Sequence, residues 1–249
     1  MSTASETGHA INVANFESLI TYCTAYGPIY NPSKNTIKLA SLNALLTSAK
    51  TALTAHNTVF TQQYENAINA RELIFEPLSK LTTRIINALD ACNVTDLTVT
   101  DAKTIARKIQ GRRASDKLPP VPDDPTTPND ESQKSISASQ MSFDNRIDNF
   151  EKLIQLLAGQ PGYLPNETDL KLITLNTLLA DMKTKNSAAI TAVTSLSNTR
   201  IARDAILYTP ETGLLDIAAE VKKYVKSVFG ATSPQSKQVS GLKFKKPKS

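Results

Sequence analysis

Tryptophan is absent from the sequence, and Phe, Tyr and Trp together make up only 6% of its residues. Eight glycines in 249 residues are too few for a fold with many tight turns. The hydrophobic residues, 40% of the chain, are mainly Leu, Ile, Val and Ala, which must therefore fill the core. This composition favours a soluble globular protein built from long helices.

Cysteine and histidine are scarce as well, with two of each. Cys23 and Cys92 form no CxxC pair and have no histidine at ligand spacing, so we expect two buried thiols and neither a disulfide nor a metal site. His9 lies in a polar stretch, and His56 falls on the apolar side of a predicted helix, where we expect it to pack. No phosphate-binding loop, nucleophile elbow or metal-ligand spacing occurs. The sequence therefore predicts no enzyme, no cofactor and no metal.

Long hydrophobic runs are also missing, since no apolar stretch approaches the roughly 18 residues of a membrane span. The opening MSTASETGHA has neither a basic nor an apolar signal region. We therefore expect a cytoplasmic protein without a membrane partner.

What the sequence does contain is a long helical pattern that occurs twice. Residues 37–51 read IKLASLNALLTSAKT, and residues 170–184 read LKLITLNTLLADMKT. The leucines, the lysines and one asparagine recur 133 residues later, which indicates an internal duplication of a long helix.

Apolar residues spaced by three and four predict the helices around it. In the first copy they predict helices over residues 12–26 and 78–91 and a basic helix over 101–111. Between the first two, a long helix is predicted to start after Asn31-Pro32-Ser33 and to end at Pro77. In the second copy the long helix covers 167–208 and ends before Pro210, and a last helix covers 214–230.

The predicted fold is all-α, with two duplicated antiparallel helical bundles, each built on one long helix of about forty residues. The boundaries are a polar tail over 1–11, a first bundle over 12–113, a Pro-rich acidic linker over 114–141, and a second bundle with a basic C-terminal tail over 142–249. The apolar residues of the long helix, spaced by three and four, are also compatible with a coiled coil.

Four segments, GHAINVANF, the repeated NFE-LI, ARKIQG and SPQSKQVSGLKFKKP, carry a resemblance to known proteins. Together they resemble a group of uncharacterised bacterial all-helical tandem-repeat proteins of similar length. The resemblance implies a bacterial origin and transfers no activity and no site.

Positive charge collects at the C-terminus. No acidic residue follows Glu220, whereas eight lysines do, and residues 1–220 alone have a net charge of about −3. Two basic segments are candidate binding sites for an anionic partner, and they comprise Lys103, Arg107, Lys108, Arg112 and Arg113 in the first copy and Lys237, Lys243, Phe244, Lys245, Lys246 and Lys248 in the second. A solvated basic tail would have the same sequence.

Asn43 and Asn176 are polar residues retained inside the most regular apolar segment. Buried in a helix seam they would fix its register, and at the edge of the seam they would bond water. The function that we expect is that of a non-enzymatic structural or protein-interaction protein, self-associating through its long helices. The alternative is a nucleic-acid or ribosome-associated protein that uses the basic segments.

Overall fold

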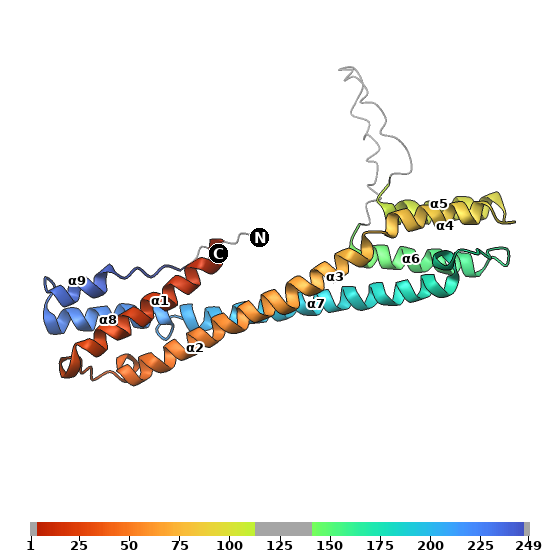
Figure 1. Ribbon diagram of the computed structural model, residues 1–249. Helices are drawn as coiled ribbons and strands as arrows, with labels where there is room; N and C mark the ends of the chain where they lie inside the picture. Colours follow the sequence, from red (N-terminus) through yellow and green to blue (C-terminus); the bar gives the residue numbers. More distant parts are fainter. Residues whose placement is uncertain (1–3, 113–140, 247–249) are drawn as a thin grey trace, which may run out of the picture. The chain divides into compact units, whose positions relative to one another are not determined.

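The computed structural model describes residues 4–112 and 141–246, and every regular element in those ranges is a helix (Figure 1). The elements are α1 (Ala4–Ala25), α2 (Leu39–Thr58), the π-helical segment η3 (Val59–Tyr64), α3 (Glu65–Phe75), α4 (Leu78–Asp90), α5 (Asp96–Gln110), α6 (Phe143–Ala158), α7 (Leu172–Tyr208), α8 (Leu214–Phe229) and α9 (Pro234–Gly241). Short 3-10 turns, η1 (Gly27–Ile29), η2 (Asn35–Ile37) and η4 (Thr168–Leu170), precede the long helices.

The two long helices have matching bounds. Elements α2, η3 and α3 run without a break from Leu39 to Phe75, and α7 runs from Leu172 to Tyr208, so both ends recur 133 residues later. Each helix stops two residues before a proline, Pro77 or Pro210, because proline disfavours the helical conformation at the preceding residue.

Side-chain caps explain three of the shorter helices. Thr95, Ser142 and Ser233 precede α5, α6 and α9, and each side-chain oxygen accepts a hydrogen bond from the backbone N–H three residues later. Gly111 ends α5 with a φ of 66°, a left-handed conformation that glycine adopts without a steric penalty.

The chain divides into two compact units, and each unit takes its helices from both halves of the sequence. Unit 1 comprises residues 1–66 and 191–249, and unit 2 comprises residues 67–190. This division differs from the expected bundles over 12–113 and 142–249. Periodicity shows which face of a helix is buried, but it does not show which other helix covers that face.

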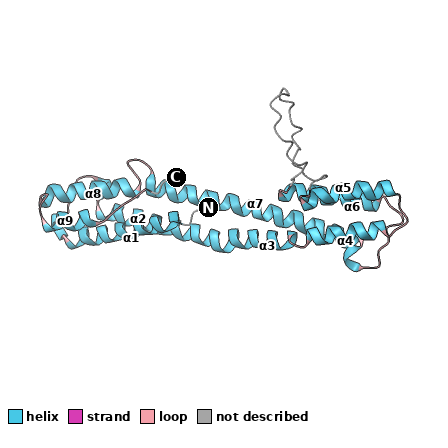
Figure 2. Ribbon diagram, turned by 90° about the horizontal axis from the view of Figure 1, so that it is seen from above, coloured by secondary structure: helices cyan, strands magenta, loops and turns pink. Residues whose placement is uncertain are grey.

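Unit 1 contains α1, α2, α8 and α9, with the C-terminal part of α7 (Figures 1 and 2). Helix α1 packs against both α2 and α8, and α9 packs against α8. The core joins residues from both ends of the chain, namely Phe16, Leu19 and Cys23 of α1, Leu42 and Leu46 of α2, Leu207 of α7, Leu214 and Val221 of α8, and Val239 of α9.

Unit 2 contains α3, α4, α5 and α6, with the N-terminal part of α7. Helix α5 lies between α4 and α6 and packs against both. The core of unit 2 comprises Phe75 of α3, Leu78, Ile85 and Leu89 of α4, Ile109 of α5, Phe150 and Leu153 of α6, and Leu175 and Met182 of α7.

Several contacts inside unit 1 have counterparts inside unit 2. The Tyr30 hydroxyl donates to the carbonyl of Ile37 at 2.6 Å, and the Tyr163 hydroxyl donates to the carbonyl of Leu170 at 2.9 Å. The ion pair of Lys50 with Glu17 is likewise matched by the ion pair of Lys183 with Glu151.

Ring pairs at the ends of the long helices also correspond. In unit 1 the rings of His9 and Tyr208 have centroids 5.5 Å apart, and in unit 2 the rings of Phe143 and Phe75 are 4.9 Å apart. The first pair is polar, with 2.6 Å between His9 Nδ1 and the Tyr208 hydroxyl, whereas the second is wholly apolar. In each unit, a ring contact therefore joins α1 or α6 to the end of a long helix from the opposite half of the sequence.

Some expected element bounds change. The polar tail expected over 1–11 is helical from Ala4, and His9 is only 2% exposed. The first long helix begins at Leu39 rather than after Ser33, and the second begins at Leu172 rather than near residue 167, because a 3-10 turn occupies the intervening residues in each case. Helix α5 begins at Asp96 because Thr95 caps it ahead of the expected start at 101.

Helix α9 was not expected, because its sequence has no apolar periodicity. The linker expected over 114–141 lies outside the described residues except for Met141. Both cysteines are free thiols, and Cys23 is buried as expected, while Cys92 is only partly buried.

Candidate functional site

The basic C-terminus is a structural part of unit 1. After α9 the chain continues as a non-helical segment over residues 242–246, here called the strap, which runs beside α1. The strap contains four of the predicted binding residues, Lys243, Phe244, Lys245 and Lys246.

Side-chain amides on α1 hold the strap through its backbone. The amide nitrogen of Asn12 donates to the carbonyl of Lys245 at 2.7 Å, and the amide oxygen of Asn12 accepts from the Lys245 N–H at 3.0 Å. Asn15, one turn later, donates to the carbonyl of Lys243 at 2.7 Å. Because Asn12 is only 1% exposed, this pairing satisfies polar groups that would otherwise be buried unbonded.

Phe244 is engaged within the fold. It packs half-buried against the core of unit 1, and the ammonium of Lys222 lies 4.8 Å from its ring centroid. The same ammonium donates to the carbonyl of Leu242 at 2.5 Å. The Phe244 ring therefore helps to hold the strap against α8.

A groove of about 360 Å³ runs between α8 and the strap. Its lining residues are Leu215, Ala219 and Lys222 of α8 and Ser240, Leu242, Lys243 and Phe244 of α9 and the strap. Burial lowers the pKa of Lys222, and the nearby positive charge of Lys243 lowers it further. Two ammonium groups therefore repel one another beside an apolar surface.

The remaining lysines of this end are on the surface. Lys237, Lys245 and Lys246 are exposed, and Lys246 lies 6.0 Å from the Tyr208 ring centroid, while Lys248 is outside the described residues. The sequence ranges of unit 1 contain thirteen Lys and Arg against seven Asp and Glu. Unit 1 is thus the cationic part of the protein.

The first basic segment lies in unit 2, so the structure does not bring it together with the strap in one unit. Lys103 forms an exposed ion pair with Asp90 at 3.2 Å. Arg107 and Lys108 are half-buried on α5, Arg112 is exposed, and Arg113 lies outside the described residues. An exposed pair such as Lys103–Asp90 contributes little stability.

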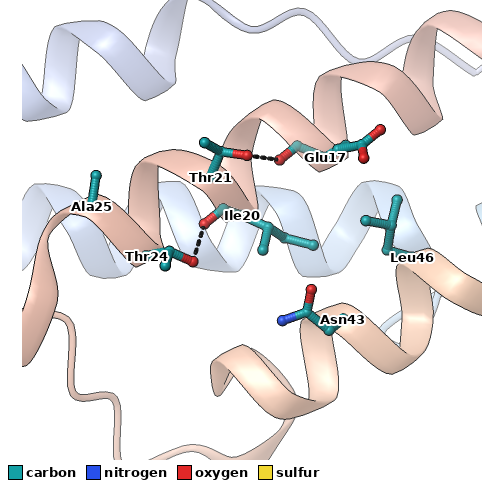
Figure 3. A pocket seen from close by; sticks show the side chains of 7 residues that line it. All are labelled: Glu17, Ile20, Thr21, Thr24, Ala25, Asn43 and Leu46. Atoms are coloured by element: carbon teal, nitrogen blue, oxygen red, sulfur yellow. Dashed lines mark hydrogen bonds between the residues drawn. The ribbon is translucent and has the colours of Figure 1, made fainter.

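Asn43 and Asn176 are both exposed, and each donates to the carbonyl four residues earlier on its own helix, at 2.8 Å. A seam position inside either unit would require burial, so these residues do not fix register within the bundles described. Asn43 instead lines a shallow hollow of about 430 Å³ on unit 1, where Asn43 and Leu46 of α2 face Glu17, Ile20, Thr21, Thr24 and Ala25 of α1 (Figure 3).

The middle part of each long helix has a feature that periodicity does not show. Residues 51–64 and 186–199 contain no Lys, Arg, Asp or Glu, although most of these positions are exposed or half-buried. On the unit 1 part of α7 the exposed fractions are 45% for Val193, inside this stretch, and 66% for Ile201, just after it. The spacing of charged residues along the sequence would have revealed this stretch.

The matching part of the first long helix contains the π-helical segment η3. Phe60 and Tyr64 are half-buried there, and their rings stack with centroids 5.7 Å apart. The buried His56 ring stacks beside Phe60 at 6.4 Å, in agreement with a packing role. Such π-helical turns interrupt long α-helices and are frequent at functional positions.

Groups suited to metal binding are not gathered in the described residues, where no cluster of three or more His, Cys, Asp or Glu could hold an ion. Within residues 4–112 and 141–246, no helix combines the length and apolar character that crossing a membrane requires. Comparison of the chain with family models, with curated proteins and with solved structures finds no match.

Proposed function

We propose that this chain is a non-enzymatic structural or protein-interaction protein that associates with further copies of itself through the uncharged middle parts of its long helices. The observation behind the proposal is the exposure of two large apolar side chains on the unit 1 part of α7, Val193 and Ile201. Interface cores are depleted of charged residues, and an exposed apolar row on a helix is a usual site of helix pairing. Pairing of this kind would resemble a short coiled coil.

An internal duplication would explain why the chain has two such helices. It is supported by the 133-residue shift of both helix bounds and by the matched Tyr30 and Tyr163 hydrogen bonds. We further propose that the protein is bacterial and acts in the cytoplasm, as the sequence expectations indicate.

Charge insertion on α7 tests the self-association. Sedimentation velocity over a range of concentrations measures the dissociation constant of the wild type and of Val193→Glu. A buried carboxylate opposite its own copy should weaken association by about tenfold or more. Val228→Glu, at a valine of α8 that is 38% exposed, is the matched control and should leave association unchanged. A wild type that stays monomeric at high concentration, or equal losses in both variants, would contradict the proposal.

A nucleic-acid-binding function is the second candidate, and the cationic end of unit 1 favours it. Filter binding of total RNA and DNA at low and physiological salt would compare the wild type with a variant in which Lys243, Lys245 and Lys246 are changed to Gln. If these lysines neutralise phosphates, each lost contact lowers the salt slope of log K by about 0.9 for a duplex. Unchanged binding and slope would rule out a role for the strap in nucleic-acid binding.

A further inference from the structure

The groove between α8 and the strap combines two chemistries on one surface of unit 1. Leu215 and Ala219 form an apolar wall on α8, and Leu242 forms the facing wall on the strap. Lys222 and Lys243 add two ammonium groups, and Ser240 adds a hydroxyl. Volumes of about 300 to 1,000 Å³ are usual for ligand sites, and this groove lies at the small end of that range.

The positive charge of this groove is not balanced by its own chain segment. No acidic residue follows Glu220 in the sequence, and Glu220 itself forms an ion pair with Lys34 at 2.6 Å. The mutual repulsion of Lys222 and Lys243 would be relieved by a carboxylate or another anion placed between them. The electrostatic complement of the groove is therefore an anion.

We propose that this groove binds an acidic and apolar peptide segment of a partner protein. One or two carboxylates of the segment pair with the ammonium groups of Lys222 and Lys243. A neighbouring apolar side chain lies against Leu215 and Leu242. The proposal rests on the protein-interaction function proposed above, but it assigns a different surface and a different partner.

The surroundings of Phe244 favour a peptide over a nucleic acid. Binding of single strands relies on bases stacking on exposed aromatic faces, whereas the Phe244 ring is half-buried and has the Lys222 ammonium 4.8 Å from its centroid. An aliphatic wall also offers a phosphate backbone nothing to bind, but it does offer a place for a leucine or valine side chain. The groove thus matches mixed acidic and apolar chemistry better than a polyphosphate.

Fluorescence anisotropy of the full chain with labelled short peptides tests this assignment. The probe is a peptide of alternating Glu and Leu, and the comparison probes are an alternating Ser and Leu peptide and an oligothymidylate of about twenty nucleotides. We expect the Glu–Leu peptide to bind most tightly, and Lys243→Gln to weaken its binding by about fivefold. Lys243→Arg should retain binding because it keeps the charge.

Lys223→Gln is the matched control, since Lys223 is an exposed lysine of α8 outside the groove and loses the same charge. An equal loss in Lys223→Gln would overturn the proposal, because the effect would then be long-range charge alone. Absence of binding, or equally tight binding of the Ser–Leu peptide, would also overturn it. Tighter binding of oligothymidylate with the same dependence on Lys243 would assign the surface to nucleic acid instead. Sedimentation of Val193→Glu reports on self-association separately, so a failure of the peptide proposal can be told apart from a failure of the proposed self-association.

Discussion

The side-chain amide of Asn12 pairs with the backbone of Lys245 through two hydrogen bonds, of 2.7 and 3.0 Å, although the two residues are 233 positions apart in the sequence. This arrangement resembles the pairing of two strands, with a side chain in place of one backbone. Asn12 also donates to the Tyr208 hydroxyl at 3.2 Å, so a single buried residue connects α1, the end of α7 and the strap. Helix α1 and the strap are thereby held together in unit 1.

Replacing Asn12 by Ala should release the strap. The change leaves the N–H and carbonyl of Lys245 without their partner, and we expect a loss of about 1–3 kcal/mol in the free energy of unfolding, measured in urea. Limited trypsin digestion should then cleave after Lys243 or Lys245 much faster than in the wild type. Asn15→Ala, which removes one exposed bond, is the control and should have a smaller effect. Equal digestion rates for wild type and Asn12→Ala would show that the amide does not hold the strap.

Cutting the chain between residues 113 and 140 should not separate its halves. A specific protease sequence inserted there would give two fragments, each of which supplies helices to both units. Because Phe16 and Leu19 share a core with Leu214 and Val221, we expect the fragments to elute together in native size-exclusion chromatography and to separate in denaturant. Autonomous bundles over 12–113 and 142–249 would instead elute separately under native conditions.

Tyr30→Phe and Tyr163→Phe should destabilise the protein by similar amounts. Each change removes the hydroxyl that bonds a buried backbone carbonyl, at Ile37 or Leu170, and should cost about 1–2 kcal/mol. Since the two sites lie in different units, the losses should add in the double variant. Chemical denaturation measures them, with Tyr22→Phe at a half-buried tyrosine of α1 as the comparison. A cost confined to one site would show that the two turns differ in energy despite their matching geometry.

The two cysteines should react at different rates. Burial raises the pKa of the Cys23 thiol to about 12, so the folded protein holds this proton at pH values where an exposed thiol has lost it. At mildly alkaline pH we expect iodoacetamide to modify the partly exposed Cys92 at least about tenfold faster than Cys23, as measured by mass spectrometry.

The raised pKa of Cys23 also predicts how the stability of the protein changes with pH. The unfolded thiol loses its proton near its ordinary pKa of 9.0, whereas the folded one retains it up to about 12. The folded state therefore binds more protons in that window, and the contribution of Cys23 to stability is lost as the pH rises from about 9 to about 12. Cys23→Ala should reduce this alkaline dependence.

In the alkylation experiment, equal rates for Cys23 and Cys92 in the native protein would contradict the burial of Cys23.

Several features were fixed by local sequence alone. The all-helical fold follows from apolar spacing of three and four and from the scarcity of glycine. The ends of both long helices follow from Pro77 and Pro210, since proline acts on its immediate neighbours whatever surrounds them. The positive C-terminus is likewise a property of the sequence.

Tertiary packing decided which halves associate and which residues remain available for binding. The apolar stripe of α2 could be covered by any amphipathic helix, and only the folded chain shows that unit 1 pairs α1 and α2 with α8. The sequence makes Phe244 a candidate binding residue of the basic tail, but contacts with Lys222 and the unit 1 core half-bury its ring. Helix formation and helix ends depend on residues a few positions apart, so the sequence pattern predicts them. The association of helices depends on contacts between residues some two hundred positions apart, and the burial of shared apolar surface decides which of them pair.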